Sequence, residues 1–410
     1  MTSRISRRSF LAGAGGLAVG AGAFGAGFAV AAGTDDGPPT GRRVPFHGPH
    51  QAGITVDPTP ARGLAAAFTV IADDRAHLAE TLRELSDEIE GLMDGRPIEV
   101  RDPAYPPTDS GILGPEPPPD DLSVVVSVGA SLFDGRYGLA DRRPRELVEM
   151  PFLANDRLDP DRSHGDLLLT IQAEHSDTVL FALRQLMRRT RRTLLLKWVV
   201  EGFNRRSSPT DRTTGSPRNL LGFVDGTANL RTDDTGRLDE HVWTDGNGEP
   251  AWTTGGSYHV IRQIRMLVEF WDRTPLAEQE GLIGRRKANG APLDGVHETD
   301  VPDYAADPEG EATPLDAHIR LANPRTPETQ RSLILRRGFS YSRGFDGAGQ
   351  LDQGLAFVSY QRSLGDGFLA VQARLDGEPL EEYIRGEGGG FFFALPGASP
   401  GGHLGDGLLA

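Results

Sequence analysis

A repeated rhythm of strand, helix and strand is the feature that most constrains how this chain can fold. Residues 65–72 have the composition of a buried strand, and residues 77–93 place Leu and Ile at helical spacing. Four more elements are expected, a strand at 122–128, a strand at 166–173, a helix at 175–189 and a strand at 193–200. The order β-α-β followed by β-α-β is the ferredoxin-like pattern.

The second half of the chain repeats this rhythm more loosely. Strands are expected at 257–268, 332–336, 355–360 and 390–395, and helices at 270–283 and 368–375. An insertion at 284–330 interrupts this half, and loops of that length are uncommon unless they carry function. The sequence therefore predicts an α+β protein of two ferredoxin-like halves, residues 61–210 and 211–410. We expect them to join near 205–219, with two sheets that pack together and leave a cleft.

The N-terminus resembles an export signal. Arg7 and Arg8 precede an uncharged run rich in Ala and Gly, which ends in the small-residue pattern Ala29-Val-Ala31. Paired arginines of this kind are typical of a twin-arginine signal, predicted here at 1–31, and an irregular segment is expected at 32–60. A membrane anchor is the alternative, but Gly and Ala contribute little transfer energy. Twin-arginine export carries folded proteins to the periplasm, cell envelope or exterior, often with a cofactor already inserted.

Charge and cysteine content exclude several classes of function. The chain has 43 Lys and Arg against 58 Asp and Glu, a net charge of −15, which argues against non-specific binding to nucleic acid or anionic membranes. It contains no cysteine, and this excludes disulfides, zinc–thiolate sites, iron–sulfur clusters, thiolate nucleophiles and thiolate-ligated haem.

Asp225 stands between Gly222 and Gly226 near the middle of the chain. Glycine allows a positive φ angle and a close approach of backbone to a flat ligand. Taken alone, Asp-Gly is an ordinary turn dipeptide. A functional interpretation of Asp225 therefore depends on residues about a hundred positions downstream.

His318 lies on a short amphipathic stretch close in sequence to Arg320, Arg325, Arg336 and Arg337. Guanidinium groups suit a ligand with carboxylates, and haem offers two propionates together with an iron that accepts a neutral imidazole. A structural histidine and a solvated, ion-paired arginine face are the alternatives.

Arg336 and Arg337 should point to opposite faces of the expected strand, so that one enters a cleft while the other stays in water. An arginine beside Asp225 would favour the ionised acid. Beside a haem, such an acid can move a proton between the two oxygens of a peroxide. The cation can stabilise the negative charge that develops as the O–O bond breaks.

Several motifs in the same order together resemble the dye-decolourising (DyP-type) peroxidase family, and most of all its exported deferrochelatase/peroxidase branch from bacterial iron-uptake systems. The motifs are Gly-Phe-Val-Asp-Gly-Thr at 222–227, His-Ile-Arg-Leu-Ala-Asn-Pro-Arg-Thr at 318–326, Leu-Arg-Arg-Gly-Phe-Ser-Tyr at 335–341, Gly-Gly-Gly-Phe-Phe-Phe-Ala-Leu-Pro at 388–396, Gly-Asp-Leu-Leu-Leu at 165–169 and His-Gln-Ala-Gly-Ile at 50–54. The resemblance extends from about residue 45 to the end of the chain.

The resemblance implies a dimeric α+β barrel-type fold with one haem b per chain in the C-terminal half. It implies that His318 is the proximal iron ligand, Asp225 the distal acid–base residue and Arg336 the distal arginine. It also places six residues at the haem, Gly226, Thr227, Ala228, Asn323, Pro324 and Arg325. The family gives the proximal histidine an acidic partner, for which Glu381 or Glu382 is the expected residue.

The main functional hypothesis is a peroxidase that reduces hydrogen peroxide and oxidises an external organic donor. The alternatives are a deferrochelatase that releases iron from haem with the porphyrin intact, and a non-catalytic haem carrier. An iron-uptake permease and a periplasmic iron-binding protein are candidate partners, and a homodimer is a candidate assembly. Five aromatic residues are candidate electron relays, although core packing is the simpler interpretation of Trp198, Trp243, Trp252, Trp271 and Tyr341.

Overall fold

The computed structural model describes residues 41–205 and 217–410. The predicted signal at 1–31 and most of the expected joint near 205–219 lie outside these residues. Within the described ranges, none of the helices combines the length and the apolar character needed to cross a membrane.

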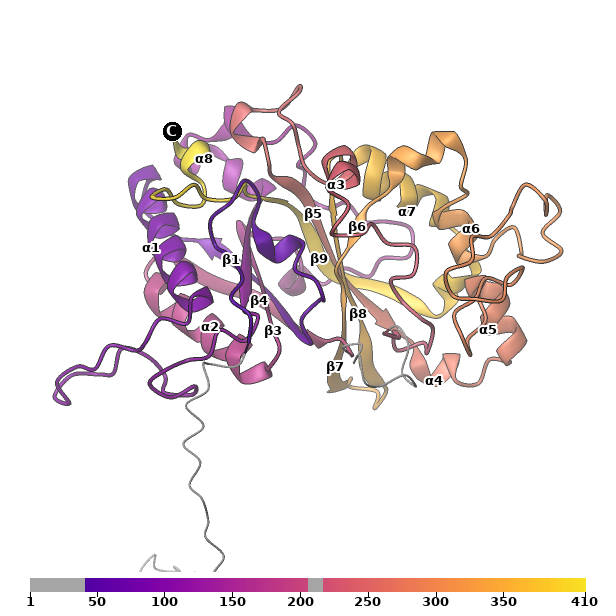
Figure 1. Ribbon diagram of the computed structural model, residues 1–410, viewed down its shortest axis with the longest axis horizontal. Coiled ribbons are helices and arrows are strands. Elements are labelled where there is room, and N and C mark those ends of the chain that lie inside the picture. The colour runs from indigo at the N-terminus through magenta and orange to yellow at the C-terminus, as the bar shows by residue number, and fades with distance from the viewer. Residues whose placement is uncertain (1–40, 206–216) are drawn as a thin grey trace, which may run out of the picture. The chain divides into compact units, whose positions relative to one another are not determined.

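The described residues form nine strands in a single antiparallel sheet (Figure 1). The strands are β1 (Arg62–Val70), β2 (Ser123–Gly129), β3 (Leu167–Ala173), β4 (Leu194–Phe203), β5 (Ser257–Met266), β6 (Leu335–Arg336), β7 (Phe339–Phe345), β8 (Leu351–Gln361) and β9 (Ile384–Ala394). Their order is β5-β9-β2-β3-β1-β4-β7-β8-β6, and β5 also pairs with β8. This last pairing closes eight of the strands into a ring, with β6 attached to β8.

Each half of the ring has ferredoxin-like strand order. The N-terminal half runs β4-β1-β3-β2 and the C-terminal half runs β9-β5-β8-β7, so both follow the order fourth, first, third, second. This confirms the predicted fold class and its two related halves.

The way in which the halves meet differs from the expected packing of two separate sheets around a cleft. They join edge to edge, β2 to β9 over three residue pairs and β4 to β7 through the pair Phe203 and Ser340. Edge strands expose unpaired backbone groups, and closure of the ring satisfies them. Alternate side chains of both halves then fill the interior, where Ala65 and Ala67 leave room for the large rings of Trp198 and Tyr360.

Two long helices, α1 (Arg75–Met93) and α2 (Ser176–Thr190), contact each other and cover the N-terminal strands (Figure 1). Leu78, Leu82, Leu85 and Ile89 of α1 are buried, as their helical spacing predicts. The C-terminal part carries six short helices, α3 (Thr235–His241), α4 (Val268–Trp271), α5 (Leu276–Ile283), α6 (His318–Ala322), α7 (Ala370–Leu375) and α8 (Asp406–Leu409).

Two expected elements of the C-terminal half differ in the structure, and one strand was not expected. The helix predicted at 270–283 is divided into α4 and α5, because Pro275 lacks a backbone donor and begins a new helix. The strand predicted at 332–336 is reduced to the two residues of β6, because the preceding residues Pro327–Ser332 form a 3₁₀ helix. Strand β7 was not expected, since its residues Ser340, Ser342 and Arg343 interrupt the hydrophobic pattern.

The aromatic residues named as candidate relays are all buried. Trp252 is the most exposed of the five, at 8%. Core packing therefore accounts for them, and none lies at the surface where an external donor could reach it.

Candidate active site

The loop that carries Asp225 is held by side chains on both sides. The Oδ1 atom of Asn219 accepts hydrogen bonds from the backbone nitrogens of Leu221 (3.1 Å) and Phe223 (3.3 Å). The indole of Trp271 donates to the carbonyl oxygen of Leu221 at 2.9 Å. These bonds fix the turn and therefore the direction in which the Asp225 side chain leaves it.

Lys287, from the long insertion, lies directly beneath the same loop. Its ammonium is 5.6 Å from the centre of the Phe223 ring and bonds Gln279 at 2.7 Å. A Cβ atom on Gly222 would approach the Lys287 side chain to 2.6 Å, and the φ of Gly222 is +85°. The positive φ therefore favours glycine at this position, and a Cβ there would displace the end of the Lys287 side chain.

Asp225 and Arg336 face each other, with 3.5 Å between a carboxylate oxygen and a guanidinium nitrogen. About one third of each side chain is exposed. Asn229 binds both backbone groups of Arg336, accepting from its nitrogen and donating to its oxygen, each at 2.8 Å. Two segments 111 positions apart in the chain are therefore locked together, as the sequence hypothesis requires.

Arg337 points to the opposite face from Arg336, as predicted, but it does not stay in water. Its side chain is buried in the interior of the ring and donates to the carbonyl oxygen of Val56. Burial lowers the pKa of Arg337 to about 10. The reason is ring closure: the face expected to be solvent-exposed became the inside of a barrel.

His318 begins α6 and bonds a buried acid. Its Nδ1 atom lies 2.8 Å and 3.1 Å from the two carboxylate oxygens of Glu378, whose side chain is 3% exposed. The prediction that Glu381 or Glu382 is the acidic partner of His318 is wrong. Glu381 instead accepts from the backbone nitrogen of Gly377 at 3.3 Å, just outside the site.

The arginines that lie near His318 in sequence separate in space. Arg320 turns away and binds Asp307 at 3.1 Å and the carbonyl oxygen of Thr313 at 2.8 Å. It therefore anchors the insertion to α6. Together with the burial of Arg337, this leaves Arg325 and Arg336 as the two cluster members available to a shared ligand.

A third arginine near this pair, Arg285, is buried and was not predicted from the sequence. Burial lowers the pKa of Arg285, and the positive charges of Arg325 and Arg336 lower it further. The buried Nε of Arg325 has no hydrogen-bond partner among the described residues. Such a donor next to two other cations suits an anionic group.

The remaining residues predicted at the haem lie in the two segments next to these side chains. Gly226 has a φ of +98° and open space where a Cβ would project, and Thr227 bonds Glu298 of the insertion at 3.1 Å. Ala228 is exposed. Asn323 ends α6 and accepts from the backbone nitrogen of Arg325 at 3.2 Å, with Pro324 between them.

The outer face of β8 completes the surroundings. Leu355 and Phe357 are half-buried there, while Ala356 and Val358 on the inner face are fully buried. Neither α6 nor α7 has a fully buried residue. An apolar sheet face, a histidine with a free Nε2 and a guanidinium whose buried Nε has no hydrogen-bond partner among the described residues together fit a flat, apolar group that carries iron and carboxylates.

Comparisons with known proteins show the family of the chain. The family model for the C-terminal domain of Dyp-type peroxidases matches residues 216–399, and the model for the N-terminal domain matches residues 51–204. The chain belongs to the Dyp-type peroxidase family. It is a peroxidase enzyme, and haem is its cofactor.

Individual relatives are similar over nearly the whole length. A protein of Escherichia coli named deferrochelatase is 50% identical over 370 residues, which cover 90% of this chain and 87% of that protein. The oxyferrous complex of DtpA from Streptomyces lividans has a TM-score of 0.80 and 36% identity, covering 90% of this chain and 98% of its own. A DyP-type peroxidase of Streptomyces coelicolor has the same TM-score at 38% identity, covering 90% and 97%.

Proposed function

We propose that this peroxidase reduces hydrogen peroxide at a haem held between His318 and the Asp225–Arg336 pair, and oxidises an external organic donor. The observation that carries the proposal is the 3.5 Å contact between Asp225 and Arg336, because it joins a proton acceptor to a fixed cation. Both side chains are partly exposed, so a small molecule can reach them.

His318 is proposed as the proximal ligand. Glu378 is buried and a carboxylate only accepts, so the Nδ1 of His318 carries the proton and Nε2 is free to bind iron. The carboxylate makes the imidazole a stronger donor to the metal. When bound, the haem supplies an iron that takes electrons from the donor and delivers them to peroxide.

Asp225 is proposed to move the proton. In its ionised form it would accept a proton from one oxygen of the peroxide and return it to the other, which would leave as water, while the haem held by His318 would supply the electrons. Arg336 stabilises the negative charge that develops on the departing oxygen. Asn229 holds the backbone of Arg336, so the cation does not have to be repositioned during the reaction.

The haem-facing residues are proposed to be Gly226, Thr227, Ala228, Asn323, Pro324 and Arg325. Gly226 offers open space for a ring edge, and the buried Nε of Arg325 is a donor for a propionate. Arg285 would add positive charge near Arg325. We assign these contacts to the C-terminal half, 211–410.

Peroxide-dependent oxidation of a phenolic donor tests the proposal. Asp225→Asn should lower kcat by about 10²- to 10⁴-fold with the Soret band retained. Asp233→Asn is the matched control, an exposed carboxylate eight positions along the chain that pairs with Arg231. Full activity in Asp225→Asn would refute the assignment of Asp225, whereas absence of peroxide turnover in the parent protein would favour a haem carrier. His318→Ala should change the absorption spectrum, and an unchanged spectrum would exclude His318 as the ligand.

A second activity, release of iron from haem with the porphyrin intact, is favoured by one observation. Relatives about 50% identical over most of the chain are named deferrochelatase. In that reaction haem is the substrate, and two protons replace the iron on the pyrrole nitrogens. Anaerobic incubation with haem decides it: free protoporphyrin as product supports the activity, and unchanged haem excludes it.

We further propose export by the twin-arginine route, with an iron-uptake permease and a periplasmic iron-binding protein as partners and a homodimer as the assembly. The support for export is the sequence pattern at Arg7 and Arg8, and the partners and the dimer rest on the family resemblance of the motifs. Replacing both arginines by lysine should retain the protein in the cytoplasm, as measured by cell fractionation. Export of that variant at the normal level would refute the route.

A further inference from the structure

A pocket of about 690 Å³ lies apart from the Asp225–Arg336 site, at one end of the strand ring. Its walls come from the end of β5, the β7–β8 hairpin, the start of β9 and the loop before β3. Five of the lining residues are arginine and four are acidic. A volume of this size is typical of small-molecule sites.

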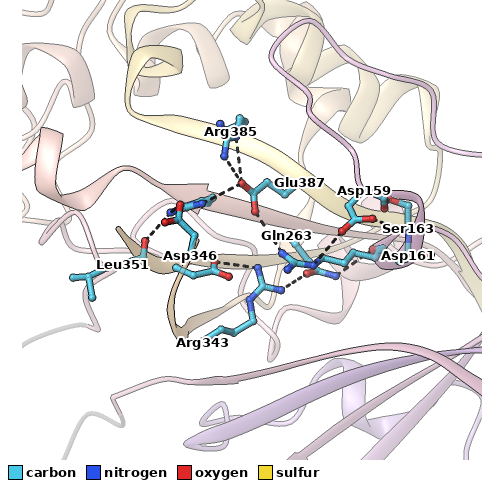
Figure 2. A network of polar contacts seen from close by, with 12 residues as sticks. Asp159, Asp161, Ser163, Gln263, Arg343, Asp346, Leu351, Arg385 and Glu387 are labelled. Atoms are coloured by element: carbon cyan, nitrogen blue, oxygen red, sulfur yellow. Dashed lines mark hydrogen bonds and ion pairs between the residues drawn. The ribbon is translucent and has the colours of Figure 1, made fainter. Parts of the chain in front are cut away.

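The carboxylates of the pocket are already engaged. Glu387 lies 2.5 Å from Arg385, 3.6 Å from Arg162 and 3.8 Å from Arg265. Figure 2 shows this arrangement, with Arg385 and Glu387 on β9 and Arg343 below them on β7. Arg162 also lies 3.4 Å from Asp159, so the four acids of the pocket are matched by four of its arginines and Arg157 is left over.

The opposite wall is also paired. Arg265 binds Asp346 at 2.7 Å, and Arg343 binds Asp352 at 3.2 Å. Arg343 also donates to Gln263 at 2.8 Å and lies over the Tyr341 ring, 4.4 Å from its centre. These contacts hold the hairpin rigidly in place as one side of the pocket.

Arg157 is the fifth arginine, and it forms no ion pair within the described part of the chain. Its only side-chain hydrogen bond runs to the carbonyl oxygen of Asp156 at 2.8 Å, and its backbone nitrogen is fixed to Gly386 at 2.7 Å. The side chain is exposed. In a chain with a net charge of −15, an unneutralised guanidinium in an arginine-rich pocket marks a local site for an anion.

Phe345 supplies the apolar side of the pocket. It is 75% exposed, the second-largest exposure among the large hydrophobic residues described, although it lines a concave surface. An exposed ring and an arginine without an ion pair, both lining the same pocket, suit a ligand that combines a flat apolar body with one carboxylate.

We propose that this pocket binds an aromatic monocarboxylate, with the carboxylate on Arg157 and the ring against Phe345. The binding itself is independent of the chemistry at the haem. Its role rests on the proposed function: the pocket would concentrate anionic aromatic donors next to the enzyme that oxidises them. Neutral donors would not be concentrated in this way.

Calorimetric titration of the haem-loaded full chain, without peroxide, tests the binding. The probe is 4-hydroxy-3-methoxybenzoate, and its neutral analogue 4-hydroxy-3-methoxybenzyl alcohol is the control ligand. A charge-assisted contact predicts about tenfold tighter binding of the carboxylate, at one molecule per chain. Equal affinities for the two ligands would overturn the proposal.

Variants locate the site. Arg157→Gln and Phe345→Ala should each weaken binding of the carboxylate about fivefold or more, and both residues are exposed, so the fold should tolerate them. Arg191→Gln, at an exposed position after α2, is the matched control and should bind like the parent. Unchanged affinity in both pocket variants, or a Soret shift that tracks binding, would place the ligand elsewhere and refute the proposal.

Kinetics separate this proposal from the peroxidase assignment. With the carboxylate as donor, Arg157→Gln should raise KM about fivefold and leave kcat unchanged. With the neutral alcohol, both constants should match the parent. If the parent protein turns over neither donor, the proposed peroxidase function is refuted. The calorimetric evidence for binding in the pocket would remain valid in that case.

Discussion

The Nδ1 atom of His318 lies 2.8 Å from a carboxylate oxygen of Glu378, sixty positions further along the chain. Glu378 is buried, and Arg374 of the adjacent helix α7 caps the last carbonyl groups of α6. The histidine is thus fixed in orientation and in tautomer. The parts of the chain that fix His318 are α6, α7 and Glu378, the acid that follows α7.

Replacement of Glu378 should separate iron binding from iron reactivity. In Glu378→Gln the amide can still accept from Nδ1 but carries no charge, so the imidazole becomes a weaker donor. We expect haem to be retained, the ferric/ferrous potential to rise and peroxide turnover to fall about 10- to 100-fold. Spectroelectrochemistry and steady-state kinetics measure both effects. Glu381→Gln is the control and should leave both unchanged; an unchanged potential in Glu378→Gln would refute the role.

Arg336 and Arg337 allow a test with two adjacent, chemically identical residues. Arg336→Met should lower peroxide turnover about 10²- to 10³-fold, because it removes the cation beside Asp225. Arg337→Met should leave turnover within about twofold, since Arg337 faces the interior of the ring. Steady-state assays on folded protein, checked by circular dichroism, give the comparison. A large loss of turnover in Arg337→Met would show that the two faces are not functionally separate.

His259 should make stability depend on acidity. It is fully buried in the ring, bonds Ser127 at 2.9 Å, and burial lowers its pKa from 6.5 to about 3. Below pH 6.5 the His259 imidazole binds a proton in the unfolded chain but stays neutral in the folded protein. The stabilisation is therefore complete above pH 6.5 and declines as the pH falls towards 3, by up to about 1.4 kcal/mol per pH unit.

Urea unfolding at pH 7 and pH 4.5 measures this effect. The parent should lose about 2.5 kcal/mol more than His259→Gln over that interval, because glutamine does not titrate. His77→Gln, an exposed replacement on α1, should behave like the parent. Equal losses in the parent and in His259→Gln would mean that this histidine is not held neutral.

The stability of the protein should fall when a single methyl group is added where the two halves join. A Cβ on Gly63 of β1 would lie 2.2 Å from the Phe339 ring, and one on Gly202 would lie 2.7 Å from the Phe339 side chain. Gly63→Ala should therefore lower the unfolding free energy by about 1–3 kcal/mol. Gly135→Ala, where a Cβ meets no atom within 4 Å, is the control.

Trimming the opposing ring provides the confirmation. Phe339→Leu removes the atoms that the new methyl group would strike, so the double variant should recover part of the loss. Denaturant unfolding of both single variants and of the double variant completes the cycle. Strictly additive losses would show that the two side chains do not meet at this joint.

The sequence by itself determined the local elements and the reactive residues. Leu78, Leu82, Leu85 and Ile89 define the buried face of α1 by their spacing alone, because helical periodicity is a local property. Asp225 and Arg336 were found from residue type and motif, and the structure brings them within 3.5 Å of each other. Such patterns need no knowledge of which distant segments touch.

Only the tertiary structure decided how the halves close and which groups they enclose. Ring closure through β5 and β8 turned the face of Arg337 from solvent to core, and nothing in residues 335–341 encodes that event. Glu378 replaced the expected Glu381 or Glu382 because the distance from α7 to α6 depends on helix packing, not on sequence separation. The arginine pocket at the ring end likewise assembles from strands more than a hundred residues apart. These outcomes follow from long-range contacts, and hydrophobic periodicity and motif spacing do not predict such contacts.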